Sequence, residues 1–203
     1  MALALTGFSV IAGGVLGWVN DVTAEPIAQA NAKILSDAIA VVVPGFDNNP
    51  AESPEMVEME GASYKIYKAT KDGEFIGAAV EASSNAFGGT LTVLVGFDPE
   101  GNIIDYSLLK HAETPGLGSK AADWFKKGAK GDITGMNPGE KPLTVSKDGG
   151  QVDAITASTI TSRAFLLAVN NAYAAYKNQH VDGASGATAQ KTSADAANNV
   201  ETK

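Results

Sequence analysis

Hydroxyl side chains crowd one short segment of the chain, residues 153–162, directly before a long apolar stretch. The hydroxyl residues are Thr156, Ser158, Thr159, Thr161 and Ser162. The spacing of apolar residues after them is typical of an amphipathic helix, so the cluster lies where a helix is predicted to begin. A helix N-terminus has unpaired N–H groups and a partial positive charge, and both suit a phosphate group. A threonine hydroxyl placed there could also be esterified by that phosphate.

Helix capping is the alternative explanation of this cluster. Serine and threonine are among the preferred N-cap residues, because their side-chain oxygen accepts a hydrogen bond from an N–H of the first helical turn. One cap accounts for one hydroxyl and leaves the others in the segment unexplained. The local sequence therefore leaves phosphate binding and capping both open.

A second segment, residues 111–119, contains a leucine with one glycine on each side. Such a turn can bring backbone N–H groups against a ligand, and the leucine would offer an apolar contact to a ring. The alternative is an ordinary strand-to-helix turn with a rigid Thr-Pro entry. The candidate binding residues of this segment are Glu113, Thr114, Gly116, Leu117 and Gly118.

The composition excludes several other kinds of site. A formal net charge of -8 and a pI near 4.7 argue against nucleic-acid binding, which depends on Lys and Arg. Because the chain has no cysteine, it cannot form disulfides, thiolate metal sites or iron–sulfur clusters by itself. The two histidines, His111 and His180, are far apart, so no metal site is predicted. No Gly-x-Gly-x-x-Gly fingerprint for NAD is present either.

The N-terminal segment has no charged side chain before Asp21. About 20 apolar residues in a helix span the hydrocarbon core of a bilayer, so residues 1–22 are predicted to be a transmembrane anchor. A signal peptide cleaved near residues 22–24 and a buried globular helix are the alternatives. The missing basic n-region and the length of the apolar run favour the anchor. Since no Lys or Arg flanks the segment, the sequence does not orient it.

An α+β domain is predicted for residues 23–178. Residues 21–42 have the spacing of an amphipathic helix, which Pro44 ends, and residues 46–56 form a loop. Alternating apolar residues and tight turns predict an antiparallel meander. Its predicted strands are residues 64–69, 74–82, 90–97 and 103–109.

Two later stretches are predicted to be helices that cover the exposed face of the sheet. They are residues 120–127 and 162–177. Residues 179–203 contain almost no large apolar side chains, so we expect this tail to be flexible.

The chain resembles the RnfG family, the FMN-bearing subunits of Rnf ion-translocating electron-transport complexes, with NqrC as a close relative. The resemblance rests on the glycine pair Gly88-Gly89, on His-x-Glu-Thr-Pro-Gly-Leu-Gly at residues 111–118 and on Asp-x-x-Thr-x-x-Thr-x-Thr-Ser at residues 153–162. It also includes the apolar N-terminal segment. Members of this family carry flavin mononucleotide (FMN) joined to a threonine by a phosphoester, which a separate flavin transferase installs from FAD.

By position the resemblance makes Thr159 the acceptor of covalent FMN. The usual segment of the family reads Ser-Gly-Ala-Thr, whereas this chain has Thr-Ala-Ser-Thr at residues 156–159. The residues beside the acceptor are therefore slightly larger here than in the usual segment. We expect Leu117 to contact the flavin ring on a turn shaped by its neighbours in residues 113–118. The residues expected around the phosphate are Thr156, Ala157, Ser158, Thr161 and Ser162.

The tail contains a rival acceptor. Residues 185–188 read Ser-Gly-Ala-Thr, which matches the usual segment more closely than residues 156–159 do. However, no apolar helix follows Thr188 to complete a pocket. The position of Thr159 at a predicted helix start favours Thr159.

The function implied by the resemblance is electron transfer, with no independent catalytic residues in this chain. The expected partners are the other membrane and redox subunits of an Rnf complex, together with a flavin transferase for maturation. The implied location is the bacterial inner membrane, crossed once, with the soluble domain on the periplasmic side. The alternatives are an FMN-bearing part of the related sodium-translocating NADH:quinone oxidoreductase and a non-redox secreted binding or scaffold domain.

Overall fold

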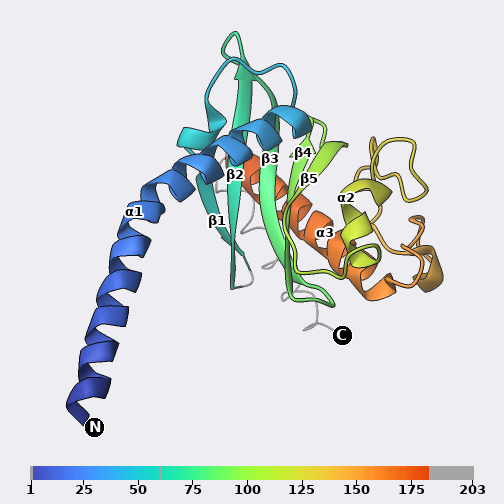
Figure 1. The fold of residues 1–203 in the computed structure, drawn as a ribbon. Helices are drawn as coiled ribbons and strands as arrows, with labels where there is room; N and C mark the ends of the chain where they lie inside the picture. Colours follow the sequence, from blue (N-terminus) through green and yellow to red (C-terminus); the bar gives the residue numbers. More distant parts are fainter. Residues whose placement is uncertain (1, 60, 183–203) are drawn as a thin grey trace, which may run out of the picture.

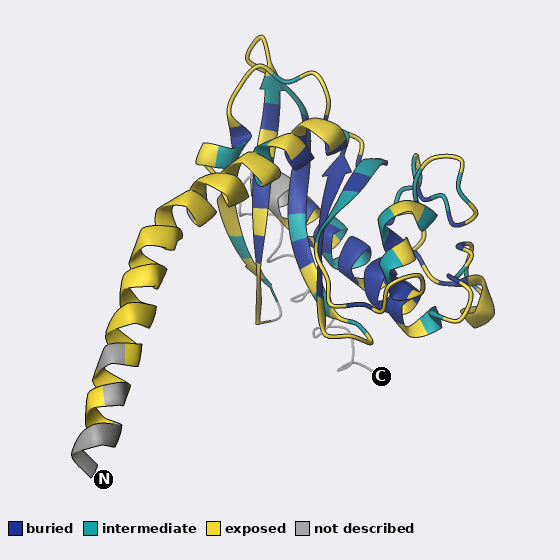
Figure 2. Ribbon diagram, in the orientation of Figure 1, coloured by how far each residue is buried: buried dark blue, intermediate teal, exposed yellow. Residues whose placement is uncertain are grey.

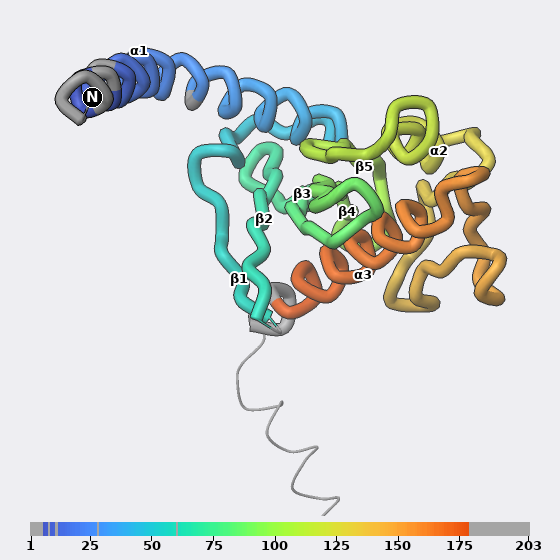
Figure 3. Tube along the Cα trace, turned by 60° about the horizontal axis from the view of Figure 1, so that its bottom comes forward, coloured from blue at the N-terminus to red at the C-terminus, as the bar shows by residue number. Residues whose placement is uncertain are grey.

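A five-stranded antiparallel sheet lies between two long helices (Figures 1 and 3). The structure is a computed structural model and describes residues 2–59 and 61–182. The strand order β1-β2-β3-β4-β5 follows the chain, so the sheet is a meander. The predicted α+β class and the predicted antiparallel meander are therefore confirmed.

The four predicted strands are all present, and each extends beyond or matches its predicted bounds. The first strand, β1, was not predicted, and part of it falls in the predicted loop 46–56. It is an edge strand with no fully buried residue, so it contributes little apolar pattern to the sequence. The strands are β1 (Glu55–Met59), β2 (Ala62–Lys71), β3 (Glu74–Asn85), β4 (Thr90–Phe97) and β5 (Ile103–Lys110).

Each face of the sheet carries a buried core. Alternate residues of β4 point to opposite faces, so Val93 and Val95 belong to the core under helix α3, while Leu94 belongs to the core under helix α1. For this reason β4 is buried at every position after Thr90. The second core is a departure from the prediction, which placed helices on only one face.

Helix α1 (Ala2–Val42) is continuous and crosses the predicted domain boundary at residue 22. Its last turns pack on the sheet through Ile39 and Val42, which are buried, whereas the N-terminal half extends away from the domain and is exposed (Figure 2). Pro26 lies inside this helix, and the helix bends between its two halves (Figure 1).

Within the part of the chain that the structure describes, no helix is long and apolar enough to cross a membrane. The predicted anchor, residues 1–22, is therefore not confirmed by the fold. Residue 1 and the side chains of residues 2–5, 8 and 11 lie outside the described part of the chain.

The predicted helix 120–127 is shorter in the structure. It is α2 (Ala121–Trp124), preceded by a 3-10 turn, η2 (Gly118–Lys120), and followed by tight turns. The predicted helix 162–177 is longer, because α3 runs over Thr159–Asp182. Residues 179–182 of the predicted tail thus continue α3. The remainder of the tail, with Thr188, lies outside the described residues.

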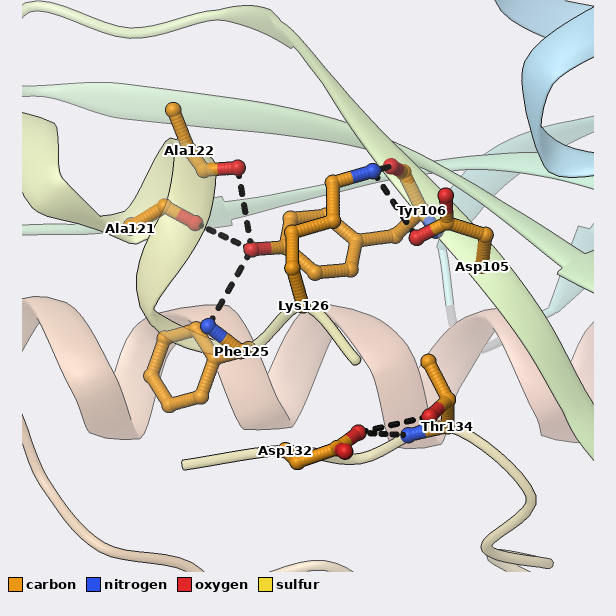
Figure 4. A network of polar contacts seen from close by, with 8 residues as sticks. All are labelled: Asp105, Tyr106, Ala121, Ala122, Phe125, Lys126, Asp132 and Thr134. Carbon is orange, nitrogen blue, oxygen red and sulfur yellow. Dashed lines mark hydrogen bonds and ion pairs between the residues drawn. The ribbon is translucent and has the colours of Figure 1, made fainter. Parts of the chain in front are cut away.

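A buried tyrosine holds α2 against the sheet (Figure 4). The Tyr106 hydroxyl of β5 donates to the Ala121 carbonyl at 2.7 Å and accepts from the Phe125 N–H at 3.3 Å. Burial raises the pKa of Tyr106 above the usual range for a phenol. The Phe125 ring stacks on Phe165 of α3, with centroids 4.3 Å apart. These contacts fix both ends of the turn that joins β5 to α2, residues 111–119.

Candidate functional site

The two segments singled out in the sequence face each other across a cavity of about 380 Å³. One wall is the turn between β5 and α2, and the other is the start of α3. Helix α3 packs along β3 and β4, which brings its N-terminus to the end of the sheet where β5 leaves it. The cavity is lined by Phe87, Glu113, Thr114, Leu117, Gly118, Ala157, Ser158, Thr159, Ile160 and Thr161.

Glu113 joins three segments of the chain at the base of this cavity. Its Oε1 accepts a hydrogen bond of 2.6 Å from the Gly88 N–H, in the loop between β3 and β4. Its Oε2 accepts one of 2.5 Å from the Thr161 hydroxyl in the first turn of α3. The Glu113 side chain is buried, and a buried carboxylate is stable only when hydrogen bonds replace its lost water. The motif residue Glu113 therefore holds the two walls together.

Two glycines are required by the packing around Glu113. A Cβ on Gly118 would lie 2.1 Å from Glu113 Oε2, and a Cβ on Gly88 would lie 2.1 Å from the Ala112 carbonyl oxygen. Neither position has room for a side chain. These glycines thus have a structural role in building the site.

Two of the clustered hydroxyls make bonds within the protein at the start of α3. The Ser162 hydroxyl donates to the Ser158 carbonyl at 3.0 Å and accepts from the Ile155 N–H at 2.9 Å. The Thr161 hydroxyl is the donor to Glu113. Both side chains are buried, so they hold the helix start in place. Thr159, by contrast, is half-buried and lines the cavity.

The backbone at Ala157 has a φ of 63°, in the left-handed region. This region favours glycine because a Cβ is strained there. The glycine of the related Ser-Gly-Ala-Thr segment would occupy this position without strain. The sharp turn at Ala157 lets Ser158 and Thr159 face the cavity at the start of the helix.

The cavity also involves residues that the sequence did not single out. The exposed apolar side chains Phe87 and Ile160 line it beside the predicted Leu117, and Phe87 is 71% exposed. Lys147 Nζ donates to Thr159 Oγ1 at 3.2 Å. The neighbouring glycine pair, Gly88-Gly89, could have indicated Phe87 from the sequence. Lys147 lies in an irregular segment and had no signal in the sequence.

Most of the predicted site residues lie together. Those that line the cavity are Glu113, Thr114, Leu117, Gly118, Ala157, Ser158, Thr159 and Thr161. Those that do not are Gly116, Thr156 and Ser162. Gly116 has a φ of 76°, as its turn requires, and its N–H donates to the Ser119 hydroxyl at 2.9 Å. The contacts of all these residues with a cofactor remain predictions.

The chemistry of this cavity suits binding of a molecule with a phosphate group and an apolar ring. Its lining offers hydroxyls, the N–H groups of a helix start and apolar side chains, and the exposed Lys147 lies beside Thr159. Across residues 2–59 and 61–182, no group of three or more metal-ligating side chains is found.

Comparison with known proteins places the cavity within a recognised domain. Residues 87–174 match the family model of the FMN-binding domain. The chain is 33% identical over 181 residues to RnfG of the ion-translocating oxidoreductase complex of Yersinia pestis, covering 84% of this chain and 86% of that protein. It is 32% identical over 171 residues to the corresponding RnfG protein of Cereibacter sphaeroides, covering 81% of this chain and 77% of that protein.

Among solved structures, the chain is similar to NqrC from Shewanella oneidensis. That match has a TM-score of 0.47 and 18% sequence identity, and it covers 64% of this chain and 70% of the other.

Proposed function

The chain belongs to the RnfG family of ion-translocating oxidoreductase complexes, and from this premise we propose that it is the FMN-bearing electron-transfer subunit of such a complex. The observation that carries the proposal is the single cavity shared by the turn 111–119 and the start of α3. Its volume of about 380 Å³ falls within the range of cofactor sites, roughly 300 to 1,000 Å³. When bound, FMN would supply one- and two-electron redox chemistry that no side chain here can perform.

The residues of the chain position the cofactor. The helix start at Ser158 and Thr159 would hold the phosphate, because the first N–H groups of α3 have no partner within the helix. Leu117, Phe87 and Ile160 would pack against the apolar ring. The Glu113 hydrogen bonds keep these two halves of the site at a fixed separation.

We further propose that Thr159 carries the flavin covalently. In this step the Thr159 oxygen attacks the phosphorus next to the riboflavin part of FAD, and the bond from that phosphorus to the AMP phosphate breaks. AMP leaves with the electron pair, the hydroxyl proton passes to a base of the flavin transferase, and a phosphodiester remains. Thr159 is supported because it lines the cavity and is only half-buried, with its hydroxyl accepting from Lys147, whereas the buried Thr161 and Ser162 hydroxyls donate to Glu113 and to the Ser158 carbonyl.

Peptide mass mapping tests this assignment. The full chain is co-expressed with a flavin transferase and FAD, and the flavin is located after proteolysis. We expect the FMN mass on the peptide that contains Thr159, its loss in Thr159→Val, and its retention in Thr188→Val. Flavin found only on the peptide with Thr188 would contradict the assignment, and a protein without any flavin would contradict the proposed function.

The exposed half of α1 supports a location at the membrane. Leu16 is 70% exposed and Trp18 is 67% exposed, and such a run of exposed apolar side chains is stable only against lipid or a protein partner. We propose that this half attaches the domain to the membrane components of the complex as a single span, with the FMN domain on the periplasmic side. Protease protection in spheroplasts tests the side, since added protease should digest the domain without cell lysis.

A further inference from the structure

Lys147 is held beside the proposed flavin acceptor by a short segment that is fixed to the core. It lies in a 3-10 turn, η3 (Ser146–Asp148). Val145 before this turn is buried, and the Ser146 N–H donates to the Val152 carbonyl at 2.7 Å. The lysine therefore extends from an anchored backbone, and its Nζ lies 3.2 Å from Thr159 Oγ1.

An ion pair joins the same turn to helix α3. Arg163 Nε lies 2.7 Å from Asp148 Oδ2, and Arg163 Nη2 lies 2.6 Å from Asp148 Oδ1. This two-bond geometry fixes the orientation of both groups. Because Arg163 is one helical turn after Thr159, the pair sets the position of η3 relative to the start of α3.

No ion pair compensates the charge of Lys147 within the described part of the chain. Asp148 is its neighbour in sequence, but the carboxylate of Asp148 is engaged by Arg163, whose hydrogen bonds hold the pKa of Asp148 below its usual range. Asp153 accepts from the Ser146 hydroxyl at 3.1 Å. Among the described residues Lys147 makes no ion pair and contacts the Thr159 oxygen. A positive charge is thus directed at the atom that would carry the phosphorus.

We propose that Lys147 is the cationic partner of the flavin phosphate, and that the Asp148–Arg163 ion pair positions it. The inference rests on the proposed function of the cavity. A phosphate at the Thr159 oxygen places its charged oxygens two bonds beyond the atom that Lys147 already contacts. Lysine acts on phosphate as a mobile point charge, and its contribution adds to that of the helix N–H groups. Lys147 thereby makes the site selective for phosphorylated flavin over riboflavin.

The test compares FMN with riboflavin, which lacks the phosphate. The full chain is produced without a flavin transferase, and each flavin is titrated by fluorescence into the wild type, Lys147→Met, Lys147→Arg and Asp148→Asn. The matched control is Lys141→Met, which removes one positive charge from another exposed loop position. Thermal melts confirm that each variant is folded.

We expect Lys147→Met to weaken FMN binding about tenfold, because the phosphate loses a charged hydrogen-bond donor, and to leave riboflavin binding unchanged. Lys147→Arg should recover most of the FMN affinity, Asp148→Asn should lose a smaller part of it, and Lys141→Met should match the wild type. Added KCl should reduce the preference for FMN in the wild type and have little effect on Lys147→Met.

The outcomes separate this inference from the proposed function. A wild type that takes up flavin on co-expression with the transferase, but whose preference for FMN over riboflavin does not depend on Lys147, overturns the inference alone. A wild type that binds neither flavin and takes up none on co-expression overturns both.

Discussion

The Thr161 hydroxyl donates a 2.5 Å hydrogen bond to Oε2 of Glu113, across 48 residues of sequence. Both side chains are buried, and each belongs to one of the two motifs that mark this chain. The bond is therefore the direct physical link between the glycine turn and the threonine-rich helix start.

Thr161→Val should destabilise the domain by about 1 to 3 kcal/mol, because the isosteric valine leaves a buried carboxylate oxygen of Glu113 without its donor. The measurement is urea unfolding followed by circular dichroism. Thr90→Val is the control, because Thr90 is exposed at the start of β4 and valine suits a strand. Equal stability of the two variants would show that the Glu113 bond has no energetic role.

Gly118→Ala should destabilise the domain by about 1 to 3 kcal/mol, because the new methyl group would occupy the place of the Glu113 carboxylate. A double-mutant cycle with Glu113→Ala isolates this cause. In the Glu113→Ala background the contact with Oε2 is gone while the contact of 2.9 Å with the Cβ of residue 113 remains, so the cost of the added methyl should fall without disappearing. An undiminished cost in that background would mean that the glycine is needed for another reason.

Ala157→Gly should stabilise the domain by about 0.5 to 1 kcal/mol, because relief of the left-handed strain at a φ of 63° exceeds the greater freedom of glycine in the unfolded chain. The midpoint of urea unfolding measures it. The control Ala154→Gly, three residues earlier and without a positive φ, should instead lower stability. A loss of stability in both variants would contradict the strain argument.

The sequence predicted the meander and the two motif segments because these depend on local patterns. Alternating apolar residues mark β2 to β5, and glycines with clustered hydroxyls mark the turn and the helix start. Edge strand β1 was missed because it buries little surface. Helix α2 was predicted too long because the residues after it bond to β5, where the Phe125 N–H donates to the Tyr106 hydroxyl and Lys126 Nζ donates to Asp105.

The division of roles within the hydroxyl cluster could not be predicted from composition. Whether a threonine lines a cavity or bonds a buried carboxylate depends on which face of α3 meets Glu113. Thr159 and Thr161 differ by two helical positions and therefore point in different directions. The role of Lys147 could not be predicted from the sequence either, because its contact with Thr159 forms only when η3 packs beside α3.

Alkaline pH should destabilise the domain, and Tyr176 is one of the groups responsible. Burial, helped by the charges of Asp98 and Glu100, raises the pKa of Tyr176 from 10.0 to about 12. The folded state holds this proton more tightly than the unfolded state, so the stabilisation is complete below about pH 10 and is lost as pH rises towards 12. Thermal melts between pH 8 and pH 12, with tyrosinate absorbance as a second signal, measure this decline.

The Tyr176→Phe variant is the control for that pH dependence. It removes the hydrogen bond of 2.9 Å from the Tyr176 hydroxyl to the Asp98 carbonyl, so we expect a loss of about 1 kcal/mol at neutral pH. Above pH 10 the decline of the melting temperature with pH should become shallower without vanishing, because burial also raises the pKa of Tyr67 and Tyr106. If the melting temperature of Tyr176→Phe declines with pH as steeply as that of the wild type, Tyr176 does not contribute to the pH dependence.

Phe87→Ala should weaken the binding of FMN and riboflavin alike, by about threefold to tenfold, because a ring contact worth roughly 1 kcal/mol is lost and the phosphate is not involved. The same fluorescence titrations measure both ligands. Leu167→Ala removes an exposed apolar side chain of α3 away from the cavity and should change neither affinity. If Phe87→Ala weakens the binding of both flavins while Lys147→Met weakens the binding of FMN alone, the flavin ring lies at the rim of the cavity and the phosphate lies at Thr159. The reverse pattern would mean that the flavin lies in the cavity with the opposite orientation.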